Sequence, residues 1–236
     1  MQFIFYVLCL HLISCRHSFN LEGPYIMKKF LLIDDHMVVR SGIKMLLSDI
    51  YKDSEISEAK DGQTALEKLQ ESDYDMVMLD IQMPNTDTFA LMEMIRTNYP
   101  TLKVLMFSMN PENIYALRFI KAGAKGFISK DAPLEEIKKA IDRVVHDKKY
   151  ISEELLSALA EGNTGGASGN PFATLSSREF EIVSMLLAGK TISGIAAELN
   201  LGISTIGTHK SRIFTKLKIV NLLELKELAN SFNFGK

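Results

Sequence analysis

Apolar residues in the first part of the chain form short runs that end in polar side chains. The clearest run is 76–79, which ends at Asp80. Comparable runs lie at 30–33, 104–107 and 126–128, and a weaker one lies at 55–59. Short apolar runs of this kind are typical of buried strands. The pattern therefore predicts five strands between residues 30 and 128.

Segments with helical spacing of apolar residues separate these runs. They cover residues 38–47, 64–69, 89–99, 112–122 and 133–145. Strands that alternate with helices predict an α/β fold, with a parallel sheet and helices on both faces. Right-handed crossovers leave few topologies open, and the flavodoxin-like order 2-1-3-4-5 is the commonest for five strands.

The pattern changes after a glycine-rich polar segment at 162–170, which has the composition of a flexible linker. Helical segments follow at 177–187, 193–199, 204–217 and 222–229, and Ser204 is expected to cap the third of them. Two short helices joined by a glycine-containing turn form a helix-turn-helix unit. We therefore expect an α/β domain at 27–147, a helical segment and linker at 148–173, and an all-α domain at 174–236.

Residues 1–26 do not fit this organisation. Their apolar run resembles a signal-peptide core, but no lysine or arginine precedes it, and it is too short to span a bilayer. Met27 opens directly into the first predicted strand. We expect residues 1–26 to be a non-native N-terminal extension and the protein to be cytoplasmic, without membrane contact. Export with lipidation at Cys15 is the alternative.

The charge is unevenly distributed along the chain. The formal net charge is −2, yet from Thr174 onward eight basic residues stand against five acidic ones. This asymmetry favours a C-terminal part that faces nucleic acid. Both cysteines lie within the first 15 residues, so the globular part offers neither a disulfide framework nor a cysteine-bound zinc site.

Polar residues whose side chains can bind a ligand or react follow four of the predicted strands. They are Asp34 and Asp35 after the first, Asp80 after the third, Ser108 after the fourth and Lys130 after the fifth. In the predicted strand order the three carboxylates converge and repel one another, and Mg²⁺ would offset that repulsion. A lysine and a hydroxyl can hold the other oxygens of an incoming phosphoryl group, with Asp80 as its nucleophilic acceptor.

This set of residues resembles the receiver domain of bacterial two-component response regulators over residues 28–147. The resemblance implies that Asp80 accepts phosphate from a sensor histidine kinase. It implies a switch formed by Ser108 and Phe127. The implied Mg²⁺ ligands are Asp34, Asp35, Asp80 and the backbone carbonyl of Gln82.

The segment from Thr174 to about Ser231 resembles the LuxR-type DNA-binding domain. Its motif includes Leu175-Ser-Ser-Arg-Glu and Ser204-Thr-Ile-Gly-Thr-His-Lys-Ser-Arg-Ile. A receiver joined to this domain implies the NarL/FixJ class, a transcription regulator that is not an enzyme and binds double-stranded promoter DNA as a phosphorylated homodimer. The residues expected to contact DNA are Thr205, Thr208, Lys210, Ser211, Arg212 and Lys216.

The chain departs from both families at a few positions. Thr88 replaces a usual glycine, and Met109 replaces a usual small residue. Gly194 and Gly207 stand where polar residues are usual, which keeps open a receiver that acts through protein contacts and no longer binds DNA. An aspartate-nucleophile phosphatase is a further alternative, but its chemistry requires an aspartate where Gln82 stands.

Overall fold

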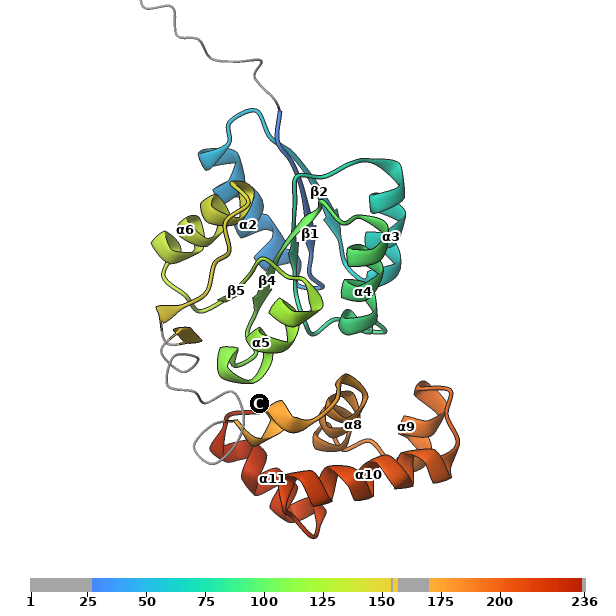
Figure 1. The fold of residues 1–236 in the computed structure, drawn as a ribbon. Helices are drawn as coiled ribbons and strands as arrows, with labels where there is room; N and C mark the ends of the chain where they lie inside the picture. The colour runs from blue at the N-terminus through green and yellow to red at the C-terminus, as the bar shows by residue number, and fades with distance from the viewer. Residues whose placement is uncertain (1–26, 154, 157–169, 235–236) are drawn as a thin grey trace, which may run out of the picture.

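The computed structural model describes residues 27–153, 155–156 and 170–234 (Figure 1). The predicted extension at 1–26 and most of the predicted linker lie outside these described residues. None of the helices within the described ranges has the length and apolar content needed to cross a membrane.

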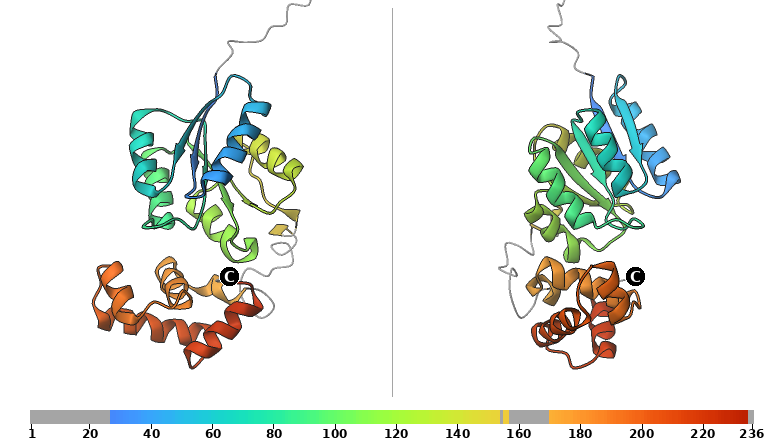
Figure 2. Two further views of the ribbon diagram at one scale, coloured as in Figure 1. Left: turned by 180° about the vertical axis from the view of Figure 1, so that it is seen from behind. Right: turned by 90° about the vertical axis from the view of Figure 1, so that its right-hand side faces the viewer.

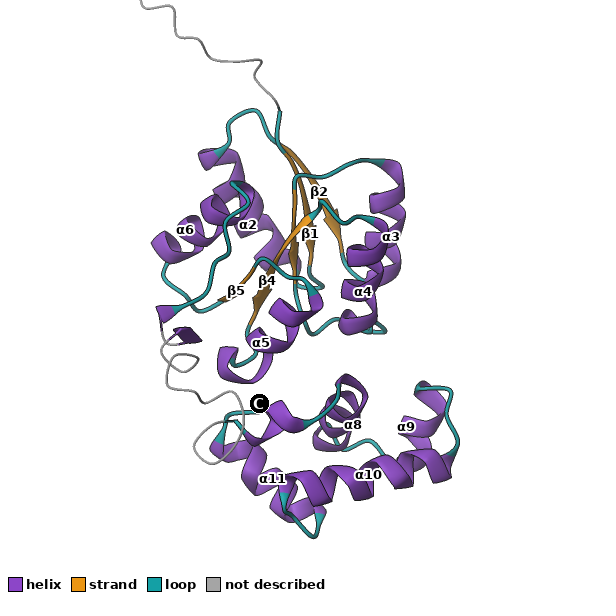
Figure 3. Ribbon diagram, viewed as in Figure 1, coloured by secondary structure: helices purple, strands orange, loops and turns teal. Residues whose placement is uncertain are grey.

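The N-terminal part contains a parallel sheet in the order β2-β1-β3-β4-β5, which confirms the predicted topology. Figure 3 shows the strands in orange. Its strands are β1 (Lys29–Ile33), β2 (Glu55–Ala59), β3 (Met76–Leu79), β4 (Lys103–Ser108) and β5 (Gly126–Ser129). All four residues of β3 are buried. This strand is apolar throughout because helices cover both faces of the sheet.

Two groups of helices cover the two faces (Figure 1). The helices are α2 (Met37–Ile50), α3 (Gly62–Glu71), α4 (Thr88–Asn98), α5 (Glu112–Ala122) and α6 (Leu134–Val145). Alternate residues of each strand point to opposite faces. Leu32 thus packs in the core under α2 and α6, whereas Leu31 packs in the core under α3, α4 and α5.

The C-terminal part is all helical within its described residues. It contains the short η1 (Pro171–Thr174), then α8 (Ser177–Leu187), α9 (Ile192–Glu198), α10 (Ile203–Leu217) and α11 (Leu222–Ser231). A capping box starts α8, since Ser176 and Glu179 each accept a backbone N–H from the other. The predicted cap of α10 was wrong: the helix begins at Ile203 after Gly202, so Ser204 lies inside its first turn.

The two parts are in direct contact. In the views of Figures 1 and 2, η1 and α8 lie next to α5, while α10 lies on the side away from the sheet. Apolar residues from both parts belong to one continuous buried cluster, which includes Phe119 of α5 and Phe180 of α8. This contact positions the second part relative to the site described next.

Candidate functional site

The ends of β1 and β3 bring acidic side chains together. The strands pair in parallel with Ile33 opposite Leu79, so Asp34 and Asp80 leave the sheet side by side. Asp34 and Asp80 are 5% and 3% exposed. One ligand atom from each of four residues lies within 4.8 Å of the others; they are Asp34, Asp35, His36 and Asp80. The structure therefore gathers the three carboxylates that the sequence pointed to.

Lys130 joins this cluster from the end of β5. Its Nζ lies 2.8 Å from Asp80 Oδ2 and 2.6 Å from Asp34 Oδ2. Burial opposes the charge on Lys130, but the hydrogen bonds to Asp34 and Asp80 outweigh burial and raise the pKa of the lysine. The ammonium group is therefore charged at neutral pH and is held beside an oxygen of the candidate acceptor.

The hydroxyl of Ser108 is held at the end of β4. Ser108 is 1% exposed, and its Oγ accepts hydrogen bonds from Asn110 Nδ2 at 3.1 Å and Asn110 N at 3.4 Å. The backbone N–H of Lys130 donates to the Ser108 carbonyl at 3.1 Å, which ties the ends of β4 and β5 together. Phe127, the other predicted switch residue, is 1% exposed within β5.

Asn110 was not identified from the sequence. It is 4% exposed and buried beside the Ser108 hydroxyl. An amide in an irregular segment adds nothing to a hydrophobic period. Its position two residues after a candidate switch hydroxyl was the only available signal.

The loop after β3 is fixed by two hydrogen bonds. Ile81 N donates to Asp80 Oδ1 at 2.7 Å, and Thr88 Oγ1 donates to the Ile81 carbonyl at 2.7 Å. Thr88 is 4% exposed, so its hydroxyl has a structural role at the position where the family usually has glycine. The same loop carries Gln82, whose side chain is exposed.

His36 is a second residue that sequence reasoning missed. Its Nδ1 lies 2.8 Å from Asp35 Oδ1 and 3.2 Å from Asp34 Oδ1. Its backbone N–H donates to Asp34 Oδ1 at 2.8 Å. A metal-binding residue type directly after Asp34-Asp35 is the signal in the sequence that points to it.

The carboxylates retain capacity for a cation. Asp34 Oδ2 and Asp35 Oδ1 are buried, and apart from ion pairs with Lys130 and His36 they have no hydrogen-bond partner among the described residues. Carboxylate oxygens with free lone pairs are ligands that Mg²⁺ prefers. The residues present therefore fit a divalent cation.

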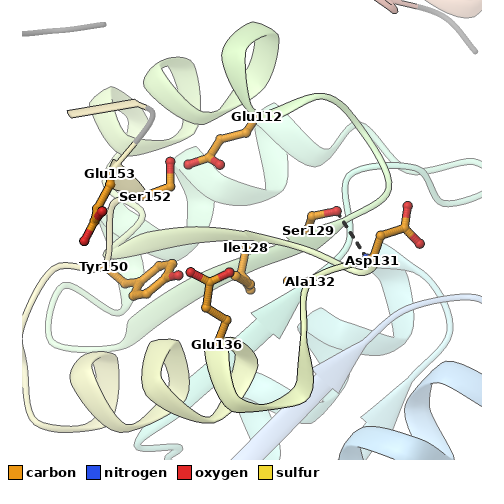
Figure 4. Close-up of a pocket in the computed structure, with 9 residues that line it drawn as sticks. All are labelled: Glu112, Ile128, Ser129, Asp131, Ala132, Glu136, Tyr150, Ser152 and Glu153. Atoms are coloured by element: carbon orange, nitrogen blue, oxygen red, sulfur yellow. Dashed lines mark hydrogen bonds between the residues drawn. The ribbon is translucent and has the colours of Figure 1, made fainter. Parts of the chain in front are cut away.

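A cavity of about 390 Å³ lies beside the end of β5 (Figure 4). Four carboxylates line it; they are Glu112, Asp131, Glu136 and Glu153. The Glu136 carboxylate and the Tyr150 hydroxyl point toward each other, and burial together with Glu136 raises the pKa of Tyr150 to about 12. An anionic wall repels phosphate, so this cavity is not a site for the phosphoryl group.

The polar face of α10 is open to solvent. The apolar residues Ile206, Ile213 and Leu217 are buried on its inner side. The outward residues that were predicted to contact DNA are exposed; they are Thr205, Thr208, Ser211, Arg212 and Lys216. Lys210 is half-buried, with its Nζ 5.2 Å from the centre of the Phe214 ring.

The hydroxyls on this face are already ordered. Thr208 Oγ1 donates to the Ser204 carbonyl at 3.0 Å, and Ser211 Oγ donates to the Gly207 carbonyl at 3.1 Å. Each oxygen keeps lone pairs that can accept a further bond. A Cβ added at Gly207 would meet no other atom within 4 Å, so packing does not require glycine there.

Lys216 joins α10 to α8. Its Nζ lies 2.6 Å from Oε2 of Glu179, a carboxylate that also accepts the Ser176 N–H at 2.8 Å. Glu179 is 4% exposed. Burial alone would raise the pKa of Glu179, but the bonds from Lys216 and Ser176 outweigh burial and lower it. Lys216 therefore has a structural partner within the domain.

Glu179→Gln should lower the stability of the C-terminal domain at neutral pH by about 1–3 kcal/mol, because a charge-assisted bond is lost and Lys216 is left unpaired. The pKa of Glu179 is lower in the folded state than its unfolded-state value of about 4.3, so the ionised carboxylate stabilises the folded domain at pH values above about 4.3. This stabilisation is lost as the pH falls through the folded-state pKa. Denaturant unfolding from pH 7 to pH 3 should therefore show the two proteins converging in acid. Glu227→Gln, at an exposed position on α11, is the control. An equal difference at every pH would contradict the role given to Glu179.

Two family models match the chain. Residues 30–142 match the response regulator receiver domain, and residues 173–229 match the bacterial regulatory proteins of the luxR family. The chain is 32% identical to the response regulator UvrY of Escherichia coli (strain K12) over 200 residues, which are 84% of this chain and 92% of UvrY. It is 33% identical to the response regulator GacA of Pseudomonas syringae pv. syringae (strain B728a) over 204 residues, which are 86% and 95% of the two chains.

The fold is shared with a solved structure of RcsB from Salmonella enterica serovar Typhimurium, bound to promoter rprA in the presence of the phosphomimetic BeF3⁻. The TM-score is 0.72 at 22% identity, over 87% of this chain and 99% of RcsB. Response regulators that combine these two domains are transcription factors rather than enzymes, in agreement with the sequence-based expectation. The acidic cluster at the sheet edge and the helix-turn-helix thus belong to one known plan, and the chain is a two-component response regulator of the NarL/FixJ class, with a receiver domain and a LuxR-type DNA-binding domain.

Proposed function

We propose that this DNA-binding response regulator accepts a phosphoryl group on Asp80 from a phosphohistidine of a sensor histidine kinase. The observation that carries the proposal is the position of Lys130 Nζ, 2.8 Å from Asp80 Oδ2 and 2.6 Å from Asp34 Oδ2. A buried carboxylate can accept a phosphoryl group on one of its oxygens, and a neighbouring cation can then stabilise the charge of the bound group.

In the proposed step the P–N bond of the kinase phosphohistidine breaks and a P–O bond to Asp80 forms. Lys130 then exchanges part of its contact with the carboxylates for a phosphoryl oxygen. Ser108, a residue that is 1% exposed, is the proposed donor to a second phosphoryl oxygen through its hydroxyl. Because its Oγ already accepts from Asn110, its own proton is directed elsewhere.

Mg²⁺ is the proposed cofactor, and when bound it would neutralise charge on the transferring group. Asp34, Asp35, Asp80 and the Gln82 carbonyl are the proposed ligands. The fixed loop between Asp80 and Thr88 supports the assignment of Gln82, since a carbonyl ligand needs a defined backbone position. Phe127 is the proposed partner of Ser108 in the switch.

On the DNA side, α10 is the proposed recognition helix. Thr205, Thr208, Ser211 and Arg212 are exposed on one face and are proposed to reach base edges or nearby phosphates. Lys210 and Lys216 are proposed phosphate contacts, and Lys216 would make its contact from the ion pair with Glu179.

The proposed organisation follows from these assignments. The receiver occupies residues 27–147, the connecting segment 148–173 and the DNA-binding domain 174–236. The phosphorylated form is proposed to pair as a homodimer on two half-sites of a promoter, in the cytoplasm where kinase and DNA are both accessible.

Selection from a random-sequence library of duplex DNA tests the DNA-reading role. The beryllofluoride-treated full-length protein should enrich one short sequence, repeated at a fixed spacing. Enrichment of no sequence, at low and at moderate salt, would favour the alternative in which the receiver acts through protein contacts. Salt must be varied because non-specific phosphate contacts dominate when it is low.

A further inference from the structure

The α4–α5 face of the receiver is covered by the C-terminal domain. Tyr115 of α5 meets the ring of Phe180 edge-on at 5.2 Å and the ring of Phe234 edge-on at 5.6 Å. Phe89 of α4 meets Phe180 at 6.2 Å, also edge-on. Tyr115, Phe180 and Phe234 are 5%, 1% and 2% exposed. The aromatic rings at the centre of the contact between the two domains are therefore buried.

Arg118 adds directional bonds to this apolar contact. Its guanidinium carbon lies 4.1 Å from the centre of the Phe180 ring. Its Nη2 donates to the carbonyls of Phe172 and Leu175, at 2.9 Å for Leu175. Burial lowers the pKa of Arg118 to about 10, so the side chain is still charged at neutral pH. One receiver residue thus holds two backbone carbonyls and one ring of the C-terminal part.

A third type of bond supports the same contact. Asn170 Nδ2 donates to the Asn113 carbonyl of α5 at 2.9 Å. Burial raises the pKa of Tyr115 to about 12, against the effects of the Ser184 hydroxyl and Arg118, which keeps the phenol neutral. Domains within one chain usually move relative to each other unless their interface is large and hydrophobic. A continuous aromatic core with partly buried hydrogen bonds from Arg118 favours a fixed arrangement.

This docked arrangement leaves the recognition helix uncovered. Thr208, Ser211 and Arg212 are exposed with both domains in place. In two perpendicular views α10 lies on the side of its domain away from the receiver, and α8 lies toward it (Figures 1 and 2). Release of the receiver would therefore expose no further part of this polar face.

We propose that Tyr115, Arg118 and Phe180 form an interdomain clamp, and that the clamped pair of domains is the form that reads DNA. The clamp fixes α10 relative to the receiver, so that two paired receivers present their recognition helices at a set spacing. Phosphorylation then acts through receiver pairing and not through the uncovering of α10. This inference rests on the proposed DNA-reading function.

The physical basis is effective concentration. When one recognition helix is bound, a rigid connection holds the second near its half-site, whereas a loose connection spreads it over a larger volume. Loss of the clamp should therefore weaken binding to two half-sites and leave binding to one half-site unchanged. A receiver that blocked DNA binding would give the opposite result, since its release would strengthen binding both to two half-sites and to one half-site.

The test uses full-length, beryllofluoride-treated protein and DNA selected by the wild type, with both half-sites intact or with one scrambled. Arg118→Ala should weaken binding to the paired probe about tenfold and change binding to the single probe by less than about twofold. Arg118→Lys keeps the charge but cannot hold two carbonyls in the same way. Its affinity for the paired probe should lie between those of the wild type and Arg118→Ala. Arg143→Ala is the matched control, because Arg143 Nε also donates to a carbonyl, that of Lys149 at 3.2 Å, only six residues further along the chain.

Thermal unfolding checks the clamp without DNA. The wild type and Arg143→Ala should unfold in one transition, and Arg118→Ala should split it into two. Tighter DNA binding by Arg118→Ala would overturn the proposal, as would equal weakening on both probes or a variant indistinguishable from the wild type in binding and unfolding. A wild type that prefers no sequence would instead contradict the proposed function, while the unfolding scans would still decide whether the clamp exists.

Discussion

Asp80→Asn should abolish phosphorylation of the full-length protein. The amide that replaces the carboxylate is a poor nucleophile, and no other carboxylate among the described residues lies both at the end of β3 and within 2.8 Å of Lys130 Nζ. We expect loss of essentially all phosphoryl transfer from an autophosphorylated sensor kinase in the presence of Mg²⁺. The phosphorylated species is measured by its altered gel mobility and by its intact mass.

The matched control is Asp73→Asn. Asp73 is exposed and precedes β3 at the opposite edge of the sheet, so its loss should leave phosphorylation unchanged. Removal of Mg²⁺ with a chelator should also stop transfer to the wild type, because the clustered carboxylates then repel the incoming group. Undiminished labelling of Asp80→Asn would refute the assignment of the acceptor.

Arg212→Ala should produce the largest loss of DNA affinity among the α10 variants. Arg212 is exposed on the polar face, and no residue in the described part of the chain forms an ion pair with it. If it contacts a guanine, its loss should cost about 1–3 kcal/mol and relax specificity at one base pair. Titration of labelled duplexes that differ by single base pairs measures both effects.

Lys216→Ala and Lys226→Ala separate base reading from charge. Lys216→Ala should weaken binding to all sequences alike and flatten the salt dependence. It also leaves Glu179 without its ion-pair partner, so its effect includes a loss of stability that Glu179→Gln measures separately. Lys226 is exposed on α11, and its removal changes the net charge by the same amount with little expected effect on affinity. Equal losses for Arg212 and Lys226 would show that only net charge matters.

Much of the fold follows from local patterns. Strands buried on both faces appear as unbroken apolar runs, which is why 76–79 coincides with β3. Helix ends were less well predicted: α2 continues to Ile50, three residues beyond the predicted end, and Gly202 rather than Ser204 precedes α10. Serine is favoured both before a helix and in its first turn, so residue type alone does not choose between the two registers.

The site could be predicted as far as strand order determines it. Asp34, Asp80 and Lys130 converge because parallel strands end at one edge, and that edge is implied by the topology. The contact of Asn110 depends on the path of an irregular segment, and that of Lys216 depends on how two separate helices pack. The hydrophobic period of the sequence encodes neither. The clamp was missed for the same reason, since Arg118 and Phe180 lie in different domains.

One measurement tests the central claim, that Asp80 controls DNA binding. The affinity of full-length wild type and Asp80→Asn for selected paired-site DNA is compared with and without beryllofluoride, in the presence of Mg²⁺. Beryllofluoride should tighten binding by the wild type about tenfold, within the usual range of coupling between two sites, and leave Asp80→Asn unchanged. A wild type that does not respond, or a variant that responds equally, would contradict the account.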